Sequence, residues 1–123
     1  AAIDFAMHEL DLHIAPIPIT VYLKGQHETD FGDSIDLGHK VIIRINKTTN
    51  WLRTLFHEFE HARQYVYCEL ELESDHVMWR GTLSSRNIDD WEEYWNSPWE
   101  VAAREKEVEL FAAFQKNLLT SSS

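Results

Sequence analysis

The chain has 123 residues, which is enough for one domain with a packed core and too few for two typical domains. Hydrophobic residues make up 44% of it and five residues are tryptophan, so the composition excludes an intrinsically disordered segment. Its 21 acidic residues against 11 basic ones give a formal net charge of -10. Because such a surface repels phosphate backbones, we expect no nucleic-acid partner.

The cysteine content and the distribution of apolar residues exclude several classes of protein. The single cysteine, Cys68, excludes an intramolecular disulfide framework and a four-cysteine zinc ribbon. No apolar run reaches the roughly 18–20 residues of a membrane span. The first residues also lack the basic start and apolar stretch of a signal peptide. We therefore expect a cytoplasmic protein with no membrane association.

The first expected element is a short amphipathic helix over residues 3–12. Its apolar residues recur at i, i+3, i+4 and i+7, the spacing of one helix face: Ile3, Ala6, Met7 and Leu10. The helix ends before Pro16 and Pro18, because each proline disfavours the helical conformation in the residue before it.

Two strands are predicted next. Residues 19–23 are β-branched and aromatic, and residues 40–46 form the clearest strand of the chain. One face of this second strand is apolar: Val41, Ile43 and Ile45. Between the two strands, residues 28–38 are rich in Asp and Gly and predict a loop or a wide hairpin connection.

The most strongly supported helix covers residues 51–68, and each of residues 48–50 is a suitable cap for it. Its apolar face is expected to pack on the sheet: Leu52, Leu55, Phe59, Ala62 and Val66. Residues 69–73 predict either a frayed helix end or a short strand. Residues 74–88 predict a loop, in which residues 77–79 form at most a brief strand.

The C-terminal part of the chain is expected to be helical. Residues 89–95 begin with a capping-box pattern and predict a short helix. The last helix begins at Pro98, whose missing N–H costs nothing at the first helical position, and reaches about Asn117. The order of elements predicts an α+β fold with an N-terminal helix, a short three-stranded sheet, a long helix and C-terminal helices. We expect a single domain over residues 1–119 and a tail over residues 120–123.

Residues 57–61 read His-Glu-Phe-Glu-His, an H-E-x-x-H sequence in the middle of the predicted helix 51–68. Residues i and i+4 share a helix face, so the imidazoles of His57 and His61 can bind one metal ion. Glu58 is displaced sideways, where its carboxylate can reach a water bound to that ion. Zinc lowers the pKa of such a water to about 7, and a glutamate can take its proton as it attacks a carbonyl group. The motif therefore predicts two zinc ligands and a general base, Glu58.

The simplest alternative is that His57 and His61 are ordinary surface residues. The apolar face of the same helix lies nearly opposite them, so both side chains point away from the predicted sheet. A chance H-E-x-x-H sequence becomes much rarer once a strong helix with apolar flanks is also required. The combination favours a metal site.

A catalytic zinc ion usually has three protein ligands and one open position, so a third ligand is needed. The metzincin pattern is excluded, because Gln64 stands where its glycine would be and Tyr67 where its third histidine would be. A gluzincin arrangement takes a glutamate from a later helix. The last helix offers Glu100, Glu105 and Glu107, while Glu109 is too far along it to be a first choice.

Two stretches of the chain together resemble a known family. Residues 55–66 read LFHEFEHARQYV, and Tyr94-Trp95 is followed by the sequence PWEVAAR at residues 98–104. Both are similar to sequences in the small single-domain metallopeptidases of bacteriophages, which are related in outline to the SprT-like and ImmA/IrrE-like minimal gluzincins. The resemblance covers about residues 40–115. It implies a zincin-like fold, a zinc cofactor, a protein or peptide substrate and, for a phage protein, the host cytoplasm.

The resemblance also implies a third ligand, because the glutamate of the P-W-E-x-x-A motif corresponds to Glu100. A structural role competes with this assignment, since Ser97-x-x-Glu100 is a capping box and the helix dipole favours a carboxylate in a first turn. SprT-like proteins that act on DNA-bound substrates carry basic or zinc-ribbon regions, and ImmA-like proteins usually carry a partner domain. This sequence shows neither, so the stand-alone phage type fits it best.

Other functional assignments stay open at this level. Tyr94, His76 and Arg104 are the candidates for stabilising an oxyanion. A substrate peptide would lie along the edge of the small sheet as an added strand. The sequence does not predict an oligomeric state. Manganese, iron, cobalt or nickel can replace zinc in such a site. The alternatives to a peptidase are an inactive binding module and a hydrolase acting on a non-peptide amide.

Overall fold

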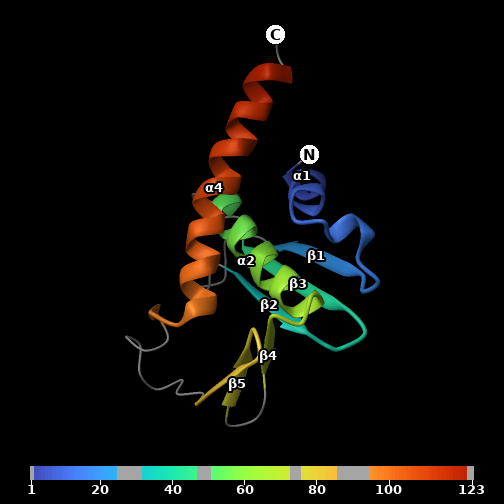
Figure 1. The fold of residues 1–123 in the computed structure, drawn as a ribbon. Coiled ribbons are helices and arrows are strands. Elements are labelled where there is room, and N and C mark those ends of the chain that lie inside the picture. Colours follow the sequence, from blue (N-terminus) through green and yellow to red (C-terminus); the bar gives the residue numbers. More distant parts are fainter. Residues whose placement is uncertain (1, 25–31, 47–50, 73–75, 86–94, 122–123) are drawn as a thin grey trace.

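The structure is a computed structural model that describes residues 2–24, 32–46, 51–72, 76–85 and 95–121. It is an α+β fold, as the sequence predicts, and Figure 1 shows the arrangement of its elements. The elements in chain order are α1 (Ala2–Glu9), the 3-10 helix η1 (Leu12–Ile14), β1 (Ile19–Lys24), β2 (Gly32–Asp36), β3 (Val41–Asn46), α2 (Trp51–Val66), β4 (Leu70–Leu72), β5 (His76–Trp79), β6 (Thr82–Ser85) and α4 (Pro98–Ser121).

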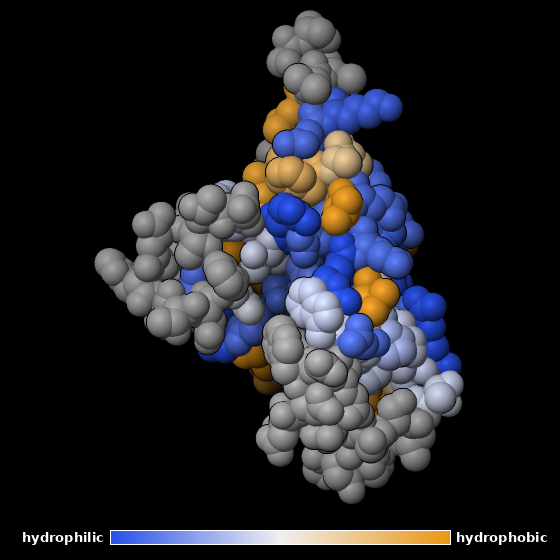
Figure 2. Space-filling model, turned by 90° about the vertical axis from the view of Figure 1, so that its left-hand side faces the viewer, coloured by the Kyte–Doolittle hydropathy of each residue, from blue (hydrophilic) through white to orange (hydrophobic). Residues whose placement is uncertain are grey.

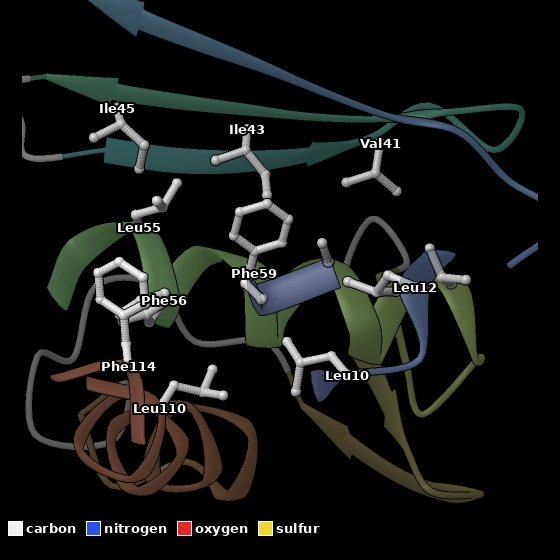
Figure 3. Close-up of a cluster of buried hydrophobic side chains, with 13 residues drawn as sticks. Leu10, Leu12, Val41, Ile43, Ile45, Leu55, Phe56, Phe59, Leu110 and Phe114 are labelled. Carbon is white, nitrogen blue, oxygen red and sulfur yellow. The ribbon is translucent and has the colours of Figure 1, made fainter. Parts of the chain in front are cut away.

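Helix α2 lies at the centre of the molecule, between a three-stranded sheet and α4 (Figure 1). The predicted apolar face of β3 is confirmed, because its three alternating side chains are fully buried: Val41, Ile43 and Ile45. Leu55 and Phe59 of α2 pack beneath this face, as Figure 3 shows. On its other side, α2 places Phe56 against Phe114 of α4, with ring centroids 5.7 Å apart. Apolar contacts therefore hold α2 from both sides.

The first sheet has the strand order β1-β3-β2, so β3 is central and β2 forms one edge. β1 runs parallel to β3 and β2 antiparallel to it. The interpretation of residues 28–38 as a loop is wrong for the part that forms β2. Its composition is poor for a strand, but Asp33 lies opposite Arg44 of β3 and forms an ion pair with it. Pairing with β3 thus forms a strand that local preference does not predict.

Gly32 is required where β2 begins. A Cβ atom at this position would lie 2.8 Å from the carbonyl oxygen of Arg44 and 2.9 Å from the side chain of Ile45. Such distances are too short for a side chain without a backbone shift. The glycine therefore lets the edge strand approach β3 closely.

A second three-stranded sheet, with the order β4-β5-β6, follows α2 and was not predicted as such. The brief strand considered for residues 77–79 is present as β5, whereas the interpretation of residues 74–88 as a loop is wrong for β6. Arg80 and Gly81 connect these strands, and both have positive φ, at 48° and 84°. This conformation at both central residues is typical of a tight two-residue hairpin turn, which sequence analysis had treated only as a loop signal.

The ends of the helices differ slightly from the prediction. α2 ends at Val66 because Cys68 has a φ of 58°, while Glu69 N–H bonds to Gln64 O and Cys68 N–H to Tyr65 O. These are the two hydrogen bonds of a Schellman motif. α1 ends at Glu9 rather than at residue 12. α4 continues through Ser121, beyond the end expected near Asn117 and into the residues expected to form a tail.

Some predictions fall on residues outside the described ranges. The predicted caps at residues 48–50 and all but the last residue of the predicted helix over 89–95 belong to this group. Within the described ranges, no helix is both long enough and apolar enough to cross a membrane.

Candidate metal centre

The H-E-x-x-H residues lie in the middle of α2, and their two imidazoles face the first turn of α4. This is the helix face opposite to the one that packs on the sheet, as the sequence predicts. The side chains of His57, His61 and Glu100 are 17%, 9% and 6% exposed. A site at this position is therefore largely shielded from water by the two helices.

Glu100 lies against both imidazoles. Its Oε2 atom is 3.2 Å from His57 Nε2, and its Oε1 atom is 2.9 Å from His61 Nε2. One ligand atom from each of the three residues lies within 4.8 Å of the others. Among the described residues, this is the group of histidine, cysteine and acidic side chains that can hold a metal ion.

The donor set and its spacing fit a zinc ion. Two imidazoles and one carboxylate form the ligand set of several catalytic zinc sites. Ligand atoms held about 2.0–2.1 Å from a tetrahedral ion lie about 3.3 Å from one another. The Nε2 atoms of His57 and His61 lie 3.2 and 2.9 Å from the two different oxygens of Glu100, close to that value. One ligand atom from each of the three residues lies within 4.8 Å of the others, so the side chains must shift to surround an ion.

The far nitrogen of each ring has its own partner. His57 Nδ1 lies 3.1 Å from Glu107 Oε1, and the other oxygen of Glu107 is 2.9 Å from Nε of Arg53. His61 Nδ1 lies 2.9 Å from Gln64 Oε1. Metal-binding histidines usually have such an outer partner, which holds the ring with its free nitrogen directed at the ion.

These contacts separate the three glutamates that the sequence offered as third ligands. Glu100 is the one whose carboxylate lies between the two Nε2 atoms. Glu107 approaches His57 from the opposite side of its ring. Glu105 is exposed and lines a cavity that also contains Arg63 and Arg80, away from the two histidines.

The carboxyl group of Glu58 is buried beside the two histidines and within hydrogen-bonding reach of Ser34, which belongs to the edge strand β2. Burial raises its pKa, and the neighbouring His61, His57 and Ser34 only partly offset the effect. A carboxylate with a raised pKa is a stronger base, which suits proton abstraction from a water molecule.

Burial and acidic neighbours act in opposite directions on the histidines. Burial by itself lowers the pKa of His57, but its hydrogen bonds with Glu100 and Glu107 raise that pKa to about 10. The pKa of His61 is also raised, because the bond with Glu100 and the charge of Glu58 outweigh its burial. The acidic neighbours of both rings therefore favour a positive charge at this position, and metal binding must displace any proton carried on Nε2.

Only one of the three oxyanion candidates has a described side chain. Tyr94 lies outside the described ranges, and the side chain of His76 is not described. The guanidinium of Arg104 stacks on the ring of Trp95 at 3.8 Å. Its Nη1 atom is buried and, in the part of the chain that the structure describes, has no hydrogen-bond partner. Arg104 follows Glu100 by one helical turn, so it shares the face of α4 that contacts the histidines.

Sequence analysis did not identify the outer partners of the two histidines. Glu107 was considered only as a ligand, and Gln64 only as a departure from the metzincin pattern. A signal was present in both cases, because Gln64 follows His61 by three residues and Glu107 follows Glu100 by seven, which places each on the face of its helix that carries the ligand.

Comparison with known proteins identifies no relative of this chain. No protein-family model matches it, and no match is found among curated proteins or among solved structures.

Proposed function

We propose that this chain is a zinc-dependent metallopeptidase of the minimal gluzincin type with a zincin-like fold. One observation carries the proposal: both Nε2 atoms of the H-E-x-x-H helix converge on the carboxylate of Glu100, with the buried Glu58 beside them. His57, His61 and Glu100 would hold the ion, and Glu58 would act as the general base. The resemblance to phage metallopeptidases favours a peptide bond as the substrate.

The chain's own residues account for the remaining steps of hydrolysis. A zinc ion bound here supplies an activated water with a pKa of about 7 and polarises the scissile carbonyl. Glu58 accepts the proton of this water and then delivers it to the leaving amine. Its carboxylate lies next to β2, whose outer edge suits an added substrate strand. Pairing along β2 would bring a peptide carbonyl close to Glu58.

Arg104 is the donor that we assign to the developing oxyanion. Leaving a buried N–H group without a partner costs free energy, and a hydrogen bond to a substrate oxygen would remove that cost. An arginine carries a permanent positive charge, which stabilises the negative charge that forms as water attacks the carbonyl. Stacking on Trp95 fixes the guanidinium before the substrate binds.

The first experiment measures zinc in the untagged protein and then its hydrolytic activity. We expect about one zinc ion per chain and cleavage of denatured casein. Glu58→Gln should retain the zinc and lose cleavage, because the amide cannot accept the proton. Arg104→Met should also retain zinc and turn over at least 100-fold more slowly, within the usual range for an oxyanion donor. Glu105→Gln, which removes an exposed charge from the same helix as Glu100, is the matched control and should retain both properties.

Three results would contradict the proposal. A protein that takes up no zinc from excess metal would be a binding module instead. Zinc binding with activity only on small amides or peptidoglycan fragments would indicate a different hydrolase. Full activity in zinc-loaded Glu58→Gln would exclude the assigned base.

A further inference from the structure

Gln64 is a fully buried polar side chain next to the proposed metal centre, with an exposed fraction of 0%. Burying an amide costs free energy unless both of its polar groups find partners. Here both do: Oε1 lies 2.9 Å from His61 Nδ1, and Nε2 donates a hydrogen bond to the carbonyl oxygen of Trp99 at 3.2 Å. The amide therefore joins a histidine of α2 to the residue that precedes Glu100 on α4.

The carbonyl of Trp99 determines the orientation of this amide. A carbonyl oxygen only accepts hydrogen bonds, so the group facing it must be the NH2 of Gln64. The amide oxygen then faces His61, and because this oxygen also only accepts, His61 Nδ1 must carry a proton. Nδ1 of His61 is thus the hydrogen-bond donor to Gln64. Nε2 is the nitrogen that can release its proton to bind an ion, and it is the atom that lies 2.9 Å from Glu100.

The position of the Trp99 carbonyl is itself supported from outside the two helices. The indole of Trp99 packs at a tilt against Trp79 of β5, with ring centroids 6.1 Å apart. Within the backbone, the N–H group of Glu100 donates a hydrogen bond to Ser97 O at 3.1 Å in the first turn of α4. The acceptor that orients Gln64 is therefore attached to the second sheet as well as to α4.

We propose that Gln64 is a positioning residue of the metal centre, whose amide directs His61 Nε2 at the ion and sets the spacing between α2 and the turn that carries Glu100. The inference rests on the proposed function, because it concerns the same site. The partner of His61 differs from that of His57, because Glu107, the partner of His57, is a charged side chain that pairs with Arg53. Of these two links, it is the one through Gln64 that joins one proposed ligand to the backbone next to another.

The test compares the zinc dissociation constants of purified variants by competition with a chromogenic chelator. Gln64→Met keeps the length of the side chain but removes both hydrogen bonds, and we expect zinc affinity to fall about 10–100-fold. Gln64→Glu should recover most of it, because a carboxyl oxygen can accept from His61 and a carboxyl that keeps its proton can donate to Trp99. This second variant also retains the shape of the buried side chain if Gln64→Met folds poorly.

Two control variants separate positioning from a general loss of stability. Val66→Ala removes buried apolar volume two residues further along α2, and Gln115→Met makes the same chemical change at an exposed position of α4. Both should bind zinc within about threefold of the wild type. An NMR readout is independent of affinity: in the zinc-loaded wild type the Nδ1 proton of His61 should exchange slowly with water, and in Gln64→Met this slow exchange should be lost.

Gln64→Met that binds zinc within threefold of the wild type and retains the slowly exchanging proton would overturn the inference and leave the proposed function standing. A wild-type chain that binds no zinc would overturn the proposed function, and with it the role of Gln64. Equal losses of affinity in Gln64→Met and Val66→Ala would also overturn the inference, because they would show that Gln64 acts only through stability.

Discussion

Helices α2 and α4 contact each other in two stretches of different chemistry. Towards the C-terminal part of α4 the contact is apolar, with Phe56 against Phe114 and Leu110 buried beside them (Figure 3). At the first turns of α4 the contact is polar, with two imidazoles against Glu100 and Glu107. The same pair of helices thus combines a hydrophobic contact with a cluster of ionisable groups.

The two stretches are expected to contribute differently to folding. Burial of a large apolar side chain contributes roughly 1.5–3 kcal/mol to stability without any ligand. Buried ionisable groups lose their hydration, and their mutual attraction often only offsets this cost. We infer that the apolar stretch holds the helices together, so that the polar stretch can be shaped for binding an ion.

The exposed surface of α4 shows a related contrast. In Figure 2 the side of the molecule that carries α4 is mostly hydrophilic, with hydrophobic residues gathered towards the C-terminal end of the helix. Among the residues of α4, Val108 and Leu118 are 56% and 48% exposed. The polar half of α4 therefore faces the proposed site with buried acids, while the far half projects partly exposed apolar side chains.

The largest expected effect comes from breaking the apolar stretch. Phe56→Ala should lower the free energy of unfolding of the metal-free protein by about 3–5 kcal/mol, because the ring is fully buried and contacts both Phe5 and Phe114. Urea denaturation measures the change. Tyr22→Ala, which removes a half-exposed aromatic ring of β1, is the control and should cost much less.

Zinc binding tests whether the apolar and polar stretches act independently. At a free zinc concentration about 100 times the dissociation constant, binding should stabilise the wild type and Phe56→Ala equally, by about 2.7 kcal/mol each. Unequal stabilisation would show that the two stretches are coupled, and would contradict the division of roles described above.

A smaller effect is expected from the polar stretch. Glu107→Gln keeps an acceptor for His57 Nδ1 but removes the charge that also pairs with Arg53. Zinc affinity should fall about tenfold, the lower end of the range for outer partners of metal-binding histidines. Glu105→Gln removes the same charge from the exposed side of α4 and should change the affinity less than twofold. If both variants bind alike, the negative charge of Glu107 has no role in metal binding.

The parts of the fold that sequence analysis predicted are those with a local pattern. The α2 helix, the apolar face of β3 and the start of α4 at Pro98 all follow from the spacing of residues near one another in the chain. β2 was missed because it forms by pairing along β3 and by the close approach that Gly32 permits. No periodicity within residues 28–38 reveals such contacts.

The residues of the candidate site likewise fall into those that local spacing predicts and those that depend on contacts with distant parts of the chain. The proposed ligands His57 and His61 follow from helical spacing alone, whereas a capping role competes with ligation for Glu100 and only the family resemblance favours the ligand. The role of Gln64 was not predicted, because a glutamine is usually exposed. Its role depends on the Trp99 carbonyl, which lies 35 residues further along the chain.

The smallest expected effect concerns an ion pair outside both stretches. Glu69 accepts hydrogen bonds from Arg63, and this contact holds its pKa below the ordinary value of 4.5. A carboxylate with a lowered pKa stabilises the fold above its ordinary pKa, and the contribution is lost as the pH falls through the lowered value. Because Glu69 is partly exposed, we expect Glu69→Gln to cost about 0.5–1 kcal/mol at pH 7. Urea denaturation at several pH values should show this difference from the wild type shrinking below pH 4.5. A difference that stays constant down to pH 3 would show that Glu69 stabilises the protein through packing rather than through its charge.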